Sequence, residues 1–520
     1  MTYRKKIAMG LLMGGLMSVP FVASEESEDD FGVQDEKVAK PGSEYEPEKD
    51  IYKWFQSFAE VVGLVEKKAF RAVDFSKFIQ DSLKSAVAQV DAHSAFFTPK
   101  SYKAALESTK GEFSGIGVSV ITKSPEDEAL VIVDVIQDGP AFKVGLESGD
   151  KIVEIQSEKL KGLSSDEVIN LLKGKSGSKV KIKVIRDKKP LEFTVVRDII
   201  KDQTSICYLF ENQKVYYVSL KIFNEVSATQ VKDILNEANK GNCKGIVLDL
   251  RRNPGGTLDA AIEMAGLFLK KDSLVVSTRD KDGRLIAQYK TSTDPILKSD
   301  VPIFILIDNF TASASEILAG CLRHHSEQNT NEKLKVFLLG TETFGKGSVQ
   351  ELIPIKNGCA LKLTTMLYYL PVNDLIQAVG IKPDFTIRPK MTPDKEMKWV
   401  EELYGKESSL KNHITVDEVK KQVKGKERKQ RSFWGRLWGK DKKKKDKKQD
   451  DDVKDKRSWE QKQIEALGSD VQVQASVNLI TLLNLARKSN VKDVETWAGS
   501  VKFLCNNYMT DDAVKIVKIR

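Results

Sequence analysis

The sequence predicts an α/β protein in which short buried strands alternate with helices. Residues 301–308 form a continuous apolar run rich in β-branched residues, which is typical of a strand buried on both faces. From Ala312 onward, Ile317, Leu318, Cys321 and Leu322 recur at helical spacing. Further strands are expected at 215–220, 245–250, 334–339 and 359–370, and helices at 227–240 and 258–270. This alternation predicts an α/β core over residues 199–390.

The chain is long enough for several domains, since it has 520 residues of which 41% are hydrophobic. Apolar residues from Trp54 to Val62 and from Phe75 to Val87 recur at intervals of three and four, which predicts helices. The expected segments are 1–24 (signal peptide), 25–50 (acidic linker), 51–110 (helical region), 111–198 (compact domain), 199–390 (α/β core), 391–423 (core-associated segment), 424–460 (basic insertion) and 461–520 (helical segment).

The first residues have the pattern of an export signal. Residues 1–6 are basic, residues 7–23 are apolar, and Val22-Ala23-Ser24 offers small side chains for cleavage before Glu25. The alternative is a retained membrane anchor. Export predicts a location in the periplasm or cell envelope of a bacterium.

The five cysteines are scattered and none has metal-ligand spacing, so no metal or cofactor is expected. Cys321 lies on the apolar side of a predicted helix and Cys243 lies just before a predicted strand. Both are therefore expected to be buried thiols.

Two serines lie where the 301–308 strand turns into a helix. Ser313 and Ser315 follow the break at 309–311, at the positive end of the helix dipole and among backbone N–H groups that could hold an oxyanion. A serine hydroxyl is a weak nucleophile without a base. The alternative is that these serines only cap the helix.

A candidate base lies beyond the next predicted strand. Lys346 stands between Gly345 and Gly347, so its backbone can pack closely against another segment and its side chain can lose water. Burial lowers the pKa of a lysine and makes the neutral amine available, which permits a Ser/Lys dyad. A surface turn or a phosphate contact is the alternative.

Histidine is the less favoured base. His324 and His325 are eleven and twelve residues beyond Ser313, about three helical turns away, so a Ser-His triad is not expected. No recognisable motif places a carboxylate or a serine beside His93, so this residue is expected to have a structural role.

The segments TASASEILAG, GTETFGKGSVQ and LDLRRNPGG together resemble the carboxyl-terminal processing proteases, also called tail-specific proteases. The resemblance implies a serine endopeptidase with an α/β core of crotonase-like type, an inserted PDZ domain, and helical N- and C-terminal segments. It also implies that Ser313 is the nucleophile, that Lys346 is the general base, and that Gln350 orients the lysine. The oxyanion donors implied are the backbone N–H groups of Ala314 and Gly256.

The segment GPAFKVGLESGDKIVEI, residues 139–155, resembles a PDZ domain, which is expected to span 111–198. Such domains bind the free carboxy-terminus of a chain as an added strand, and a glycine-containing loop holds the carboxylate. The matching loop residues are Gly115, Ile116, Gly117 and Val118. A PDZ fold that serves only as scaffold is the alternative.

Residues 424–457 account for the whole net charge of +9, because they contain sixteen basic and seven acidic residues. The remainder is formally neutral, which argues against recognition of nucleic acid. Aromatic residues 433–438 lie among these cations, as in interfacial membrane segments. A charged linker and a membrane-surface contact both remain open.

The resulting hypothesis is an exported serine endopeptidase that acts on unfolded or carboxy-terminal segments of protein substrates recognised by the PDZ domain. An adaptor protein or a second copy of the chain is a possible partner. The alternative is an inactive PDZ adaptor, which an intact Ser313, Lys346 and Gln350 argues against.

Overall fold

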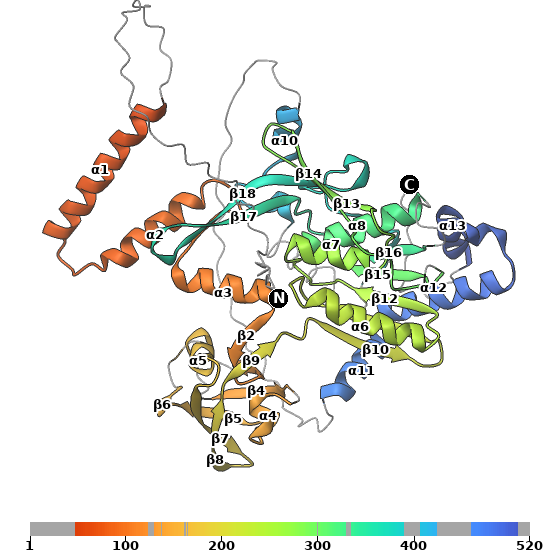
Figure 1. Ribbon diagram of the computed structural model, residues 1–520, viewed down its shortest axis with the longest axis horizontal. Helices are drawn as coiled ribbons and strands as arrows, with labels where there is room; N and C mark the ends of the chain where they lie inside the picture. The colour runs from red at the N-terminus through yellow and green to blue at the C-terminus, as the bar shows by residue number, and fades with distance from the viewer. Residues whose placement is uncertain are drawn as a thin grey trace, which may run out of the picture. The chain divides into compact units, whose positions relative to one another are not determined.

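The computed structural model describes residues 47–122, 129–136, 138–160, 163, 165–298, 300–328, 334–388, 406–423 and 459–507 (Figure 1). The expected signal peptide, most of the acidic linker and nearly all of the basic insertion lie outside these ranges. Contacts divide the chain into one unit of residues 1–98 with 351–363 and a second of 99–350 with 364–520. Within the described ranges, every helix is too short or too polar to cross a membrane.

The first unit is built mainly from two helices and a short strand. It contains α1 (Pro47–Lys68), α2 (Phe75–Val87) and β1 (Ala95–Phe97). The helices agree with the apolar periodicity, whereas β1 was not expected within the predicted helical region. Its three residues pair antiparallel with the start of β18 (Ala360–Tyr369), at Ala95↔Lys362. A strand this short is specified by its distant partner rather than by its own pattern.

His93 lies in a turn organised by Asp91. The Asp91 carboxylate accepts the backbone N–H groups of His93, at 2.7 Å, and of Ser94, at 2.9 Å. The Ser94 hydroxyl also donates to this carboxylate. The structure therefore gives His93 a place in a hydrogen-bonded turn.

The second unit begins with a helix and two antiparallel sheets. Its elements are α3 (Pro99–Lys110), β2 (Glu112–Gly115), β3 (Val118–Thr122), β4 (Leu130–Val135), α4 (Pro140–Lys143), β5 (Lys151–Ile155), β6 (Glu158–Lys159), α5 (Ser165–Leu172), β7 (Lys179–Arg186), β8 (Lys189–Val196) and β9 (Asp198–Lys201). One sheet has the order β3-β4-β5-β7-β8, and β2 pairs with β9. Alternate residues of β7, Val180, Ile182 and Val184, are buried in a core to which Val168 of α5 belongs. Strand β3 is left at one edge of the larger sheet.

The α/β part follows. Its elements are β10 (Ser205–Phe210), β11 (Val215–Leu220), α6 (Ser227–Lys240), β12 (Gly245–Asp249), α7 (Leu258–Gly266), β13 (Leu274–Arg279), β14 (Leu285–Lys290), β15 (Ile303–Ile307), α8 (Ala314–Glu327), β16 (Val336–Gly340), β17 (Ser348–Pro354), η1 (Lys356–Gly358), β18, η2 (Pro371–Asn373), β19 (Phe385–Thr386), η3 (Glu407–Ser409), α10 (Val416–Val423), α11 (Trp459–Ser469), α12 (Val471–Lys488), η4 (Lys492–Glu495) and α13 (Trp497–Asn507). The main sheet has the order β10-β11-β12-β15-β16-β19 and is parallel from β11 to β19. The hairpin β13–β14 was not predicted.

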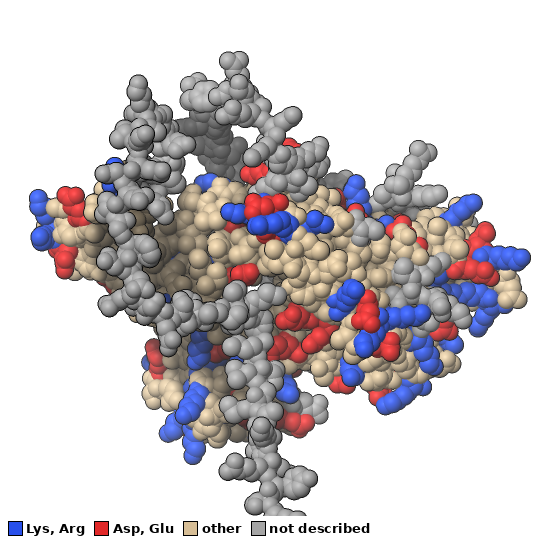
Figure 2. Space-filling model, turned by 45° about the horizontal axis from the view of Figure 1, so that its top comes forward, with Lys and Arg blue, Asp and Glu red and all other residues tan. Residues whose placement is uncertain are grey.

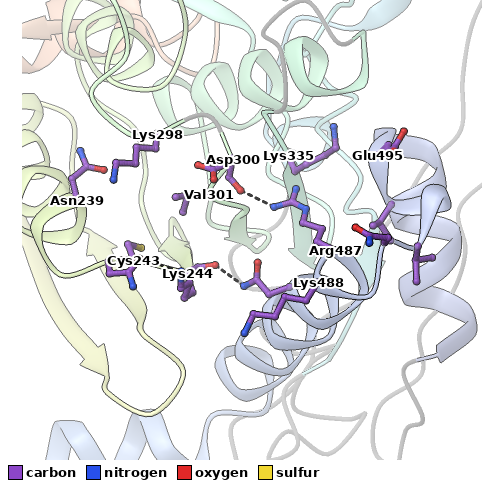
Figure 3. A pocket seen from close by; sticks show the side chains of 15 residues that line it. Asn239, Cys243, Lys244, Lys298, Asp300, Val301, Lys335, Arg487, Lys488 and Glu495 are labelled. Carbon is purple, nitrogen blue, oxygen red and sulfur yellow. Dashed lines mark hydrogen bonds between the residues drawn. The ribbon is translucent and has the colours of Figure 1, made fainter.

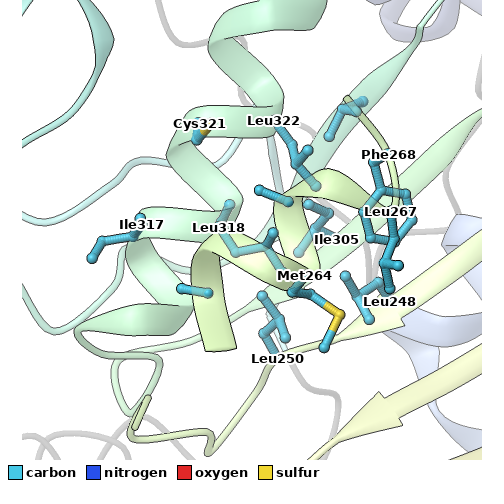
Figure 4. Packing of buried hydrophobic residues seen from close by; sticks show 14 of the residues in the cluster. Leu248, Leu250, Met264, Leu267, Phe268, Ile305, Ile317, Leu318, Cys321 and Leu322 are labelled. Atoms are coloured by element: carbon cyan, nitrogen blue, oxygen red, sulfur yellow. The ribbon is translucent and has the colours of Figure 1, made fainter. Parts of the chain in front are cut away.

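Helices cover both faces of the parallel sheet. Ile303 and Ile305 of β15 face a core shared with α6, α7 and α8, whereas Phe304 faces a second core shared with α12. Figure 4 shows part of the first core, where side chains of α7 and α8 meet those of β12 and β15. This burial on both faces explains why the strands are continuous apolar runs.

Helix α12 is joined to the sheet by a partly buried ionic group. The guanidinium of Arg251 contacts Asp249 at the end of β12 and Asp470 at the start of α12. Burial opposes the charge of Arg251, but the hydrogen bonds and charges of Asp249 and Asp470 outweigh it and raise the pKa of the guanidinium. The group joins α12 to the loop after β12.

The cysteines in the described ranges are free thiols. Cys321 is fully buried, as expected, and Cys243 is half-buried. Burial raises the pKa of Cys207 to about 11.

On the face seen in Figure 2, basic and acidic side chains are interspersed.

Candidate active site

The serine turn lies at the carboxyl end of β15, where the chain enters α8. Ser313 has φ 56° and ψ −117°, in the left-handed half of backbone space that a non-glycine residue rarely adopts. Its side chain is mostly buried, with 7% of the residue exposed. Such strained residues persist only where the surroundings hold them, and they cluster at functional sites. Ser315, the other candidate, is fully buried and its hydroxyl donates to the Asn253 carbonyl at 3.1 Å.

Lys346 and Gln350 are in direct contact at the carboxyl side of β16. The Lys346 Nζ donates to Gln350 Oε1 at 2.7 Å and to the Ser348 carbonyl at 3.3 Å. The Gln350 amide in turn donates to the hydroxyls of Ser348, at 2.9 Å, and Thr364, at 3.2 Å. The Gln350 amide is thus held at both ends, with its oxygen toward the lysine and its nitrogen toward the two hydroxyls.

One carboxylate joins the serine turn to the lysine loop. Glu316 is fully buried in the first turn of α8. Its Oε2 accepts the backbone N–H groups of both Ser313, at 2.8 Å, and Lys346, at 2.9 Å. Its Oε1 accepts the N–H of Gly345, at 2.8 Å, and the Thr343 hydroxyl. The backbone nitrogens of the two predicted catalytic residues thus share one acceptor oxygen.

Burial determines the titration of this carboxylate. Loss of water raises the pKa of Glu316 to about 7, although the hydrogen bonds from Thr343, Ser313, Gly345 and Lys346 oppose the shift. The four donors explain how a carboxylate can be kept in the core next to the two predicted catalytic residues.

The glycine loop after β12 lies against the serine turn. A Cβ on Gly255 would lie 2.6 Å from the Ala312 carbonyl and 2.8 Å from the Ala314 nitrogen, so only glycine allows this approach. A Cβ on Gly256, at φ 151°, would lie 1.8 Å from the Phe223 carbonyl. Asn253 accepts the Gly255 N–H at 2.9 Å through its side chain.

Two backbone N–H groups near this loop are available to an oxyanion. The Gly256 N–H meets no acceptor among the described residues, in contrast to the N–H of Gly255. Ala314 is the first residue of α8, so its N–H has no partner within the helix. The predicted choice of Gly256 over Gly255 is consistent with these hydrogen bonds and stays a prediction.

The histidines near Ser313 in sequence lie at the other end of α8. His324 and His325 are in its last turn, about 16 Å along the helix axis from the serine. The Nε2 of His325 lies 2.8 Å from the Leu274 carbonyl. This arrangement gives no support to a Ser-His triad.

The predicted carboxylate-binding loop of the PDZ part lies between β2 and β3. The carbonyl oxygens of Ile116 and Gly117 accept the N–H groups of Ala141, at 2.8 Å, and Ile136, at 3.0 Å. In the described part of the chain, no acceptor receives the N–H groups of Ile116 and Gly117. Val118 begins the edge strand β3, where a peptide strand could be added.

Two parts of the chain match models of known protein families. Models of "Peptidase family S41" and "PDZ domain" match residues 214–387 and 114–196. The carboxy-terminal-processing protease of Bartonella bacilliformis is 34% identical over 374 residues, covering 71% of this chain and 82% of the relative. The chain belongs to this family of serine peptidases.

A second curated relative and a solved structure are also similar to this chain. A probable CtpA-like serine protease of Staphylococcus aureus (strain N315) is 32% identical over 329 residues, and the chain spans 63% of it. The solved structure of a photosystem II D1 C-terminal processing protease is 24% identical and matches 66% of this chain and 89% of its own, with a TM-score of 0.38. The family models place the PDZ match before the S41 match along the chain.

Sequence reasoning missed the central role of Glu316. It assigned no role to Glu316, and it did not single out Thr343, Ser348 or Thr364. The spacing Ser313-x-x-Glu316 is that of a capping box, in which the glutamate reaches back to the serine N–H. That signal predicts the contact with Ser313 but not the contacts with the distant lysine loop.

Replacing Glu316 with glutamine tests the titration of the buried carboxylate. The pKa of Glu316, about 7 when folded, lies above its ordinary value of 4.5, so ionisation disfavours the folded state. Its stabilising contribution is complete below about pH 4.5 and is lost as the pH rises through about 7. The free energy of unfolding of the parent, relative to that of Glu316→Gln, should fall by up to about 3 kcal/mol between these limits. Unfolding of both proteins across this pH range measures the difference, and a pH-independent difference would contradict it.

Proposed function

We propose that this protease uses Ser313 as nucleophile and Lys346 as general base. The neutral Lys346 amine takes the proton of the Ser313 hydroxyl as its oxygen attacks the scissile carbonyl. The N–H groups of Ala314 and Gly256 stabilise the oxyanion. The protonated lysine then gives its proton to the leaving amine, and water, deprotonated by Lys346, hydrolyses the acyl-enzyme.

The observation on which this proposal rests is the shared carboxylate of Glu316. It accepts an N–H from each of the two residues and so ties the backbone of nucleophile and base to one buried group. Gln350 supports the same assignment, because its oxygen holds the lysine amine while its own amide is fixed by Ser348 and Thr364. No step requires a metal or cofactor.

Substrate choice is proposed to depend on the PDZ part. A substrate would add its carboxy-terminal segment to edge strand β3, with its carboxylate at the N–H groups between Gly115 and Val118. The protease core is proposed to be of crotonase-like type, and the protein to be exported to the periplasm or cell envelope. A PDZ adaptor without catalysis remains the second candidate only if the following experiment fails.

Cleavage of an unfolded protein tests the dyad. Ser313→Ala and Lys346→Ala should each lower kcat/KM by at least about 1,000-fold, since each removes a group needed for attack. Ser315→Ala is the matched control and should retain most of the activity, because its hydroxyl only donates to the Asn253 carbonyl. Activity that survives Lys346→Ala would exclude the lysine as base, and a parent that cuts no substrate would favour the adaptor.

Binding of two peptides tests the PDZ proposal. The peptides are identical except that one ends in a carboxylate and the other in an amide, and the protein is the full Ser313→Ala chain, which leaves them intact. The amide should bind at least about tenfold more weakly, because it loses charge-assisted hydrogen bonds to backbone N–H groups. Equal affinity, measured by fluorescence anisotropy, would contradict carboxylate recognition.

A further inference from the structure

A second concave site lies at the end of the sheet opposite the catalytic residues. Its cavity of about 700 Å³ is lined by residues that precede β12, β15 and β16 and by the last turn of α12 (Figure 3). Ser313 and Lys346, by contrast, follow β15 and β16. Because these strands are parallel and five residues long, the two sites are separated by about the length of a strand, roughly 16 Å. The volume is in the range of sites for small molecules.

The lining has a surplus of three positive charges. Five cations, Lys244, Lys298, Lys335, Arg487 and Lys488, face the cavity together with only two carboxylates, Asp300 and Glu495. Figure 3 shows Lys298 beside Asn239 on one side, and Lys335 and Arg487 with Asp300 on the other. No carboxylate among the described residues forms an ion pair with Lys335, Lys298 or Lys488.

Lys335 is the decisive residue. It is 2% exposed, and no acceptor in the described ranges receives its ammonium group. Burial lowers the pKa of Lys335, and the like charge of Arg487 lowers it further. Burial also lowers the pKa of Arg487, whose guanidinium donates to the Asp300 backbone carbonyl at 2.6 Å. The charge of Asp300 partly offsets that of Arg487, whereas Lys335 has no counter-ion among the described residues, so an anion that joins the two cations would stabilise them.

Hydrogen bonds between the segments fix the wall of the cavity. The Asn239 amide nitrogen donates to the Ile296 carbonyl at 2.8 Å. The Asn484 amide of α12 donates to the Lys244 carbonyl, also at 2.8 Å. These bonds join the segments before β12 and β15 to their neighbours, so the cavity is a fixed part of the fold.

We propose that this cavity binds a small phosphate-bearing molecule, with its phosphate between Lys335 and Arg487. A phosphate monoester carries nearly two negative charges at neutral pH, which suits the surplus of positive charge. Lysine and arginine both bind phosphate through charge-assisted hydrogen bonds. The site does not overlap the proposed catalytic residues, so the inference is independent of the protease mechanism.

Calorimetric titration of the full chain tests the site. The ligands are inorganic pyrophosphate and a phosphate ester of glycerol, at constant ionic strength. Lys335→Met keeps the aliphatic volume and removes the charge, so it should weaken binding of both ligands at least about tenfold. Lys488→Gln changes an exposed lining residue and should weaken both severalfold without affecting the fold.

The control variant is Lys232→Gln, which removes an exposed lysine of the same helix as Asn239 outside the cavity. It should bind like the parent. Two results would assign the anion to other basic residues and overturn the proposal. One is that Lys232→Gln weakens binding as much as Lys488→Gln does. The other is that Lys335→Met and Lys488→Gln both bind the ligands as tightly as the parent does. Absence of saturable binding at millimolar ligand would overturn it as well. Ser313→Ala should bind as the parent does, whatever the outcome for catalysis.

Discussion

The buried carboxylate of Glu316 is the constraint on which the site depends. It lies in the first turn of α8, yet it accepts hydrogen bonds from the serine turn and from the loop after β16, two segments about thirty residues apart in the chain. A carboxylate without donors would be very costly at this depth. The backbone must therefore present Ser313, Gly345 and Lys346 N–H groups toward one point, and that requirement fixes both loops relative to the helix. The strained backbone of Ser313 is held by the same contact.

The parallel sheet makes this convergence possible. Strands β12, β15 and β16 are buried on both faces and end at the same edge, where their following loops supply the glycine turn, the serine and the lysine. Helix α12, although more than a hundred residues beyond the lysine, is joined to this edge through Arg251 and Asp470. Helix α12 also packs at the opposite edge, where cations outnumber carboxylates around the cavity. One sheet thus presents two chemically different ends.

Much of this organisation could be predicted from the sequence. The main strands are continuous apolar runs, and in the helices apolar residues recur every three to four residues. The pairing of Lys346 with Gln350 also followed from the resemblance. What could not be predicted depends on distant partners. Strand β1 has three residues and is defined by β18, and the hairpin β13–β14 has one strand whose residues are mostly exposed. Glu316 looked like an ordinary capping residue, since its contacts with Gly345 and Lys346 arise only in the folded chain. The cationic cavity is assembled from four separate segments, so no local sequence pattern predicts it.

The most direct test of the account concerns the state of the Lys346 amine. In Gln350→Glu the neutral acceptor next to Lys346 becomes a carboxylate, which stabilises the ammonium and so withholds the free amine until higher pH. If Lys346 is the general base, the acid limb of the kcat/KM profile moves to higher pH by about one unit or more, with activity recovered in alkaline solution. Glu351→Gln, at the exposed neighbouring position, serves as the control and leaves the profile unchanged. A Gln350→Glu profile that coincides with that of the parent would contradict the assignment of Lys346 as the base.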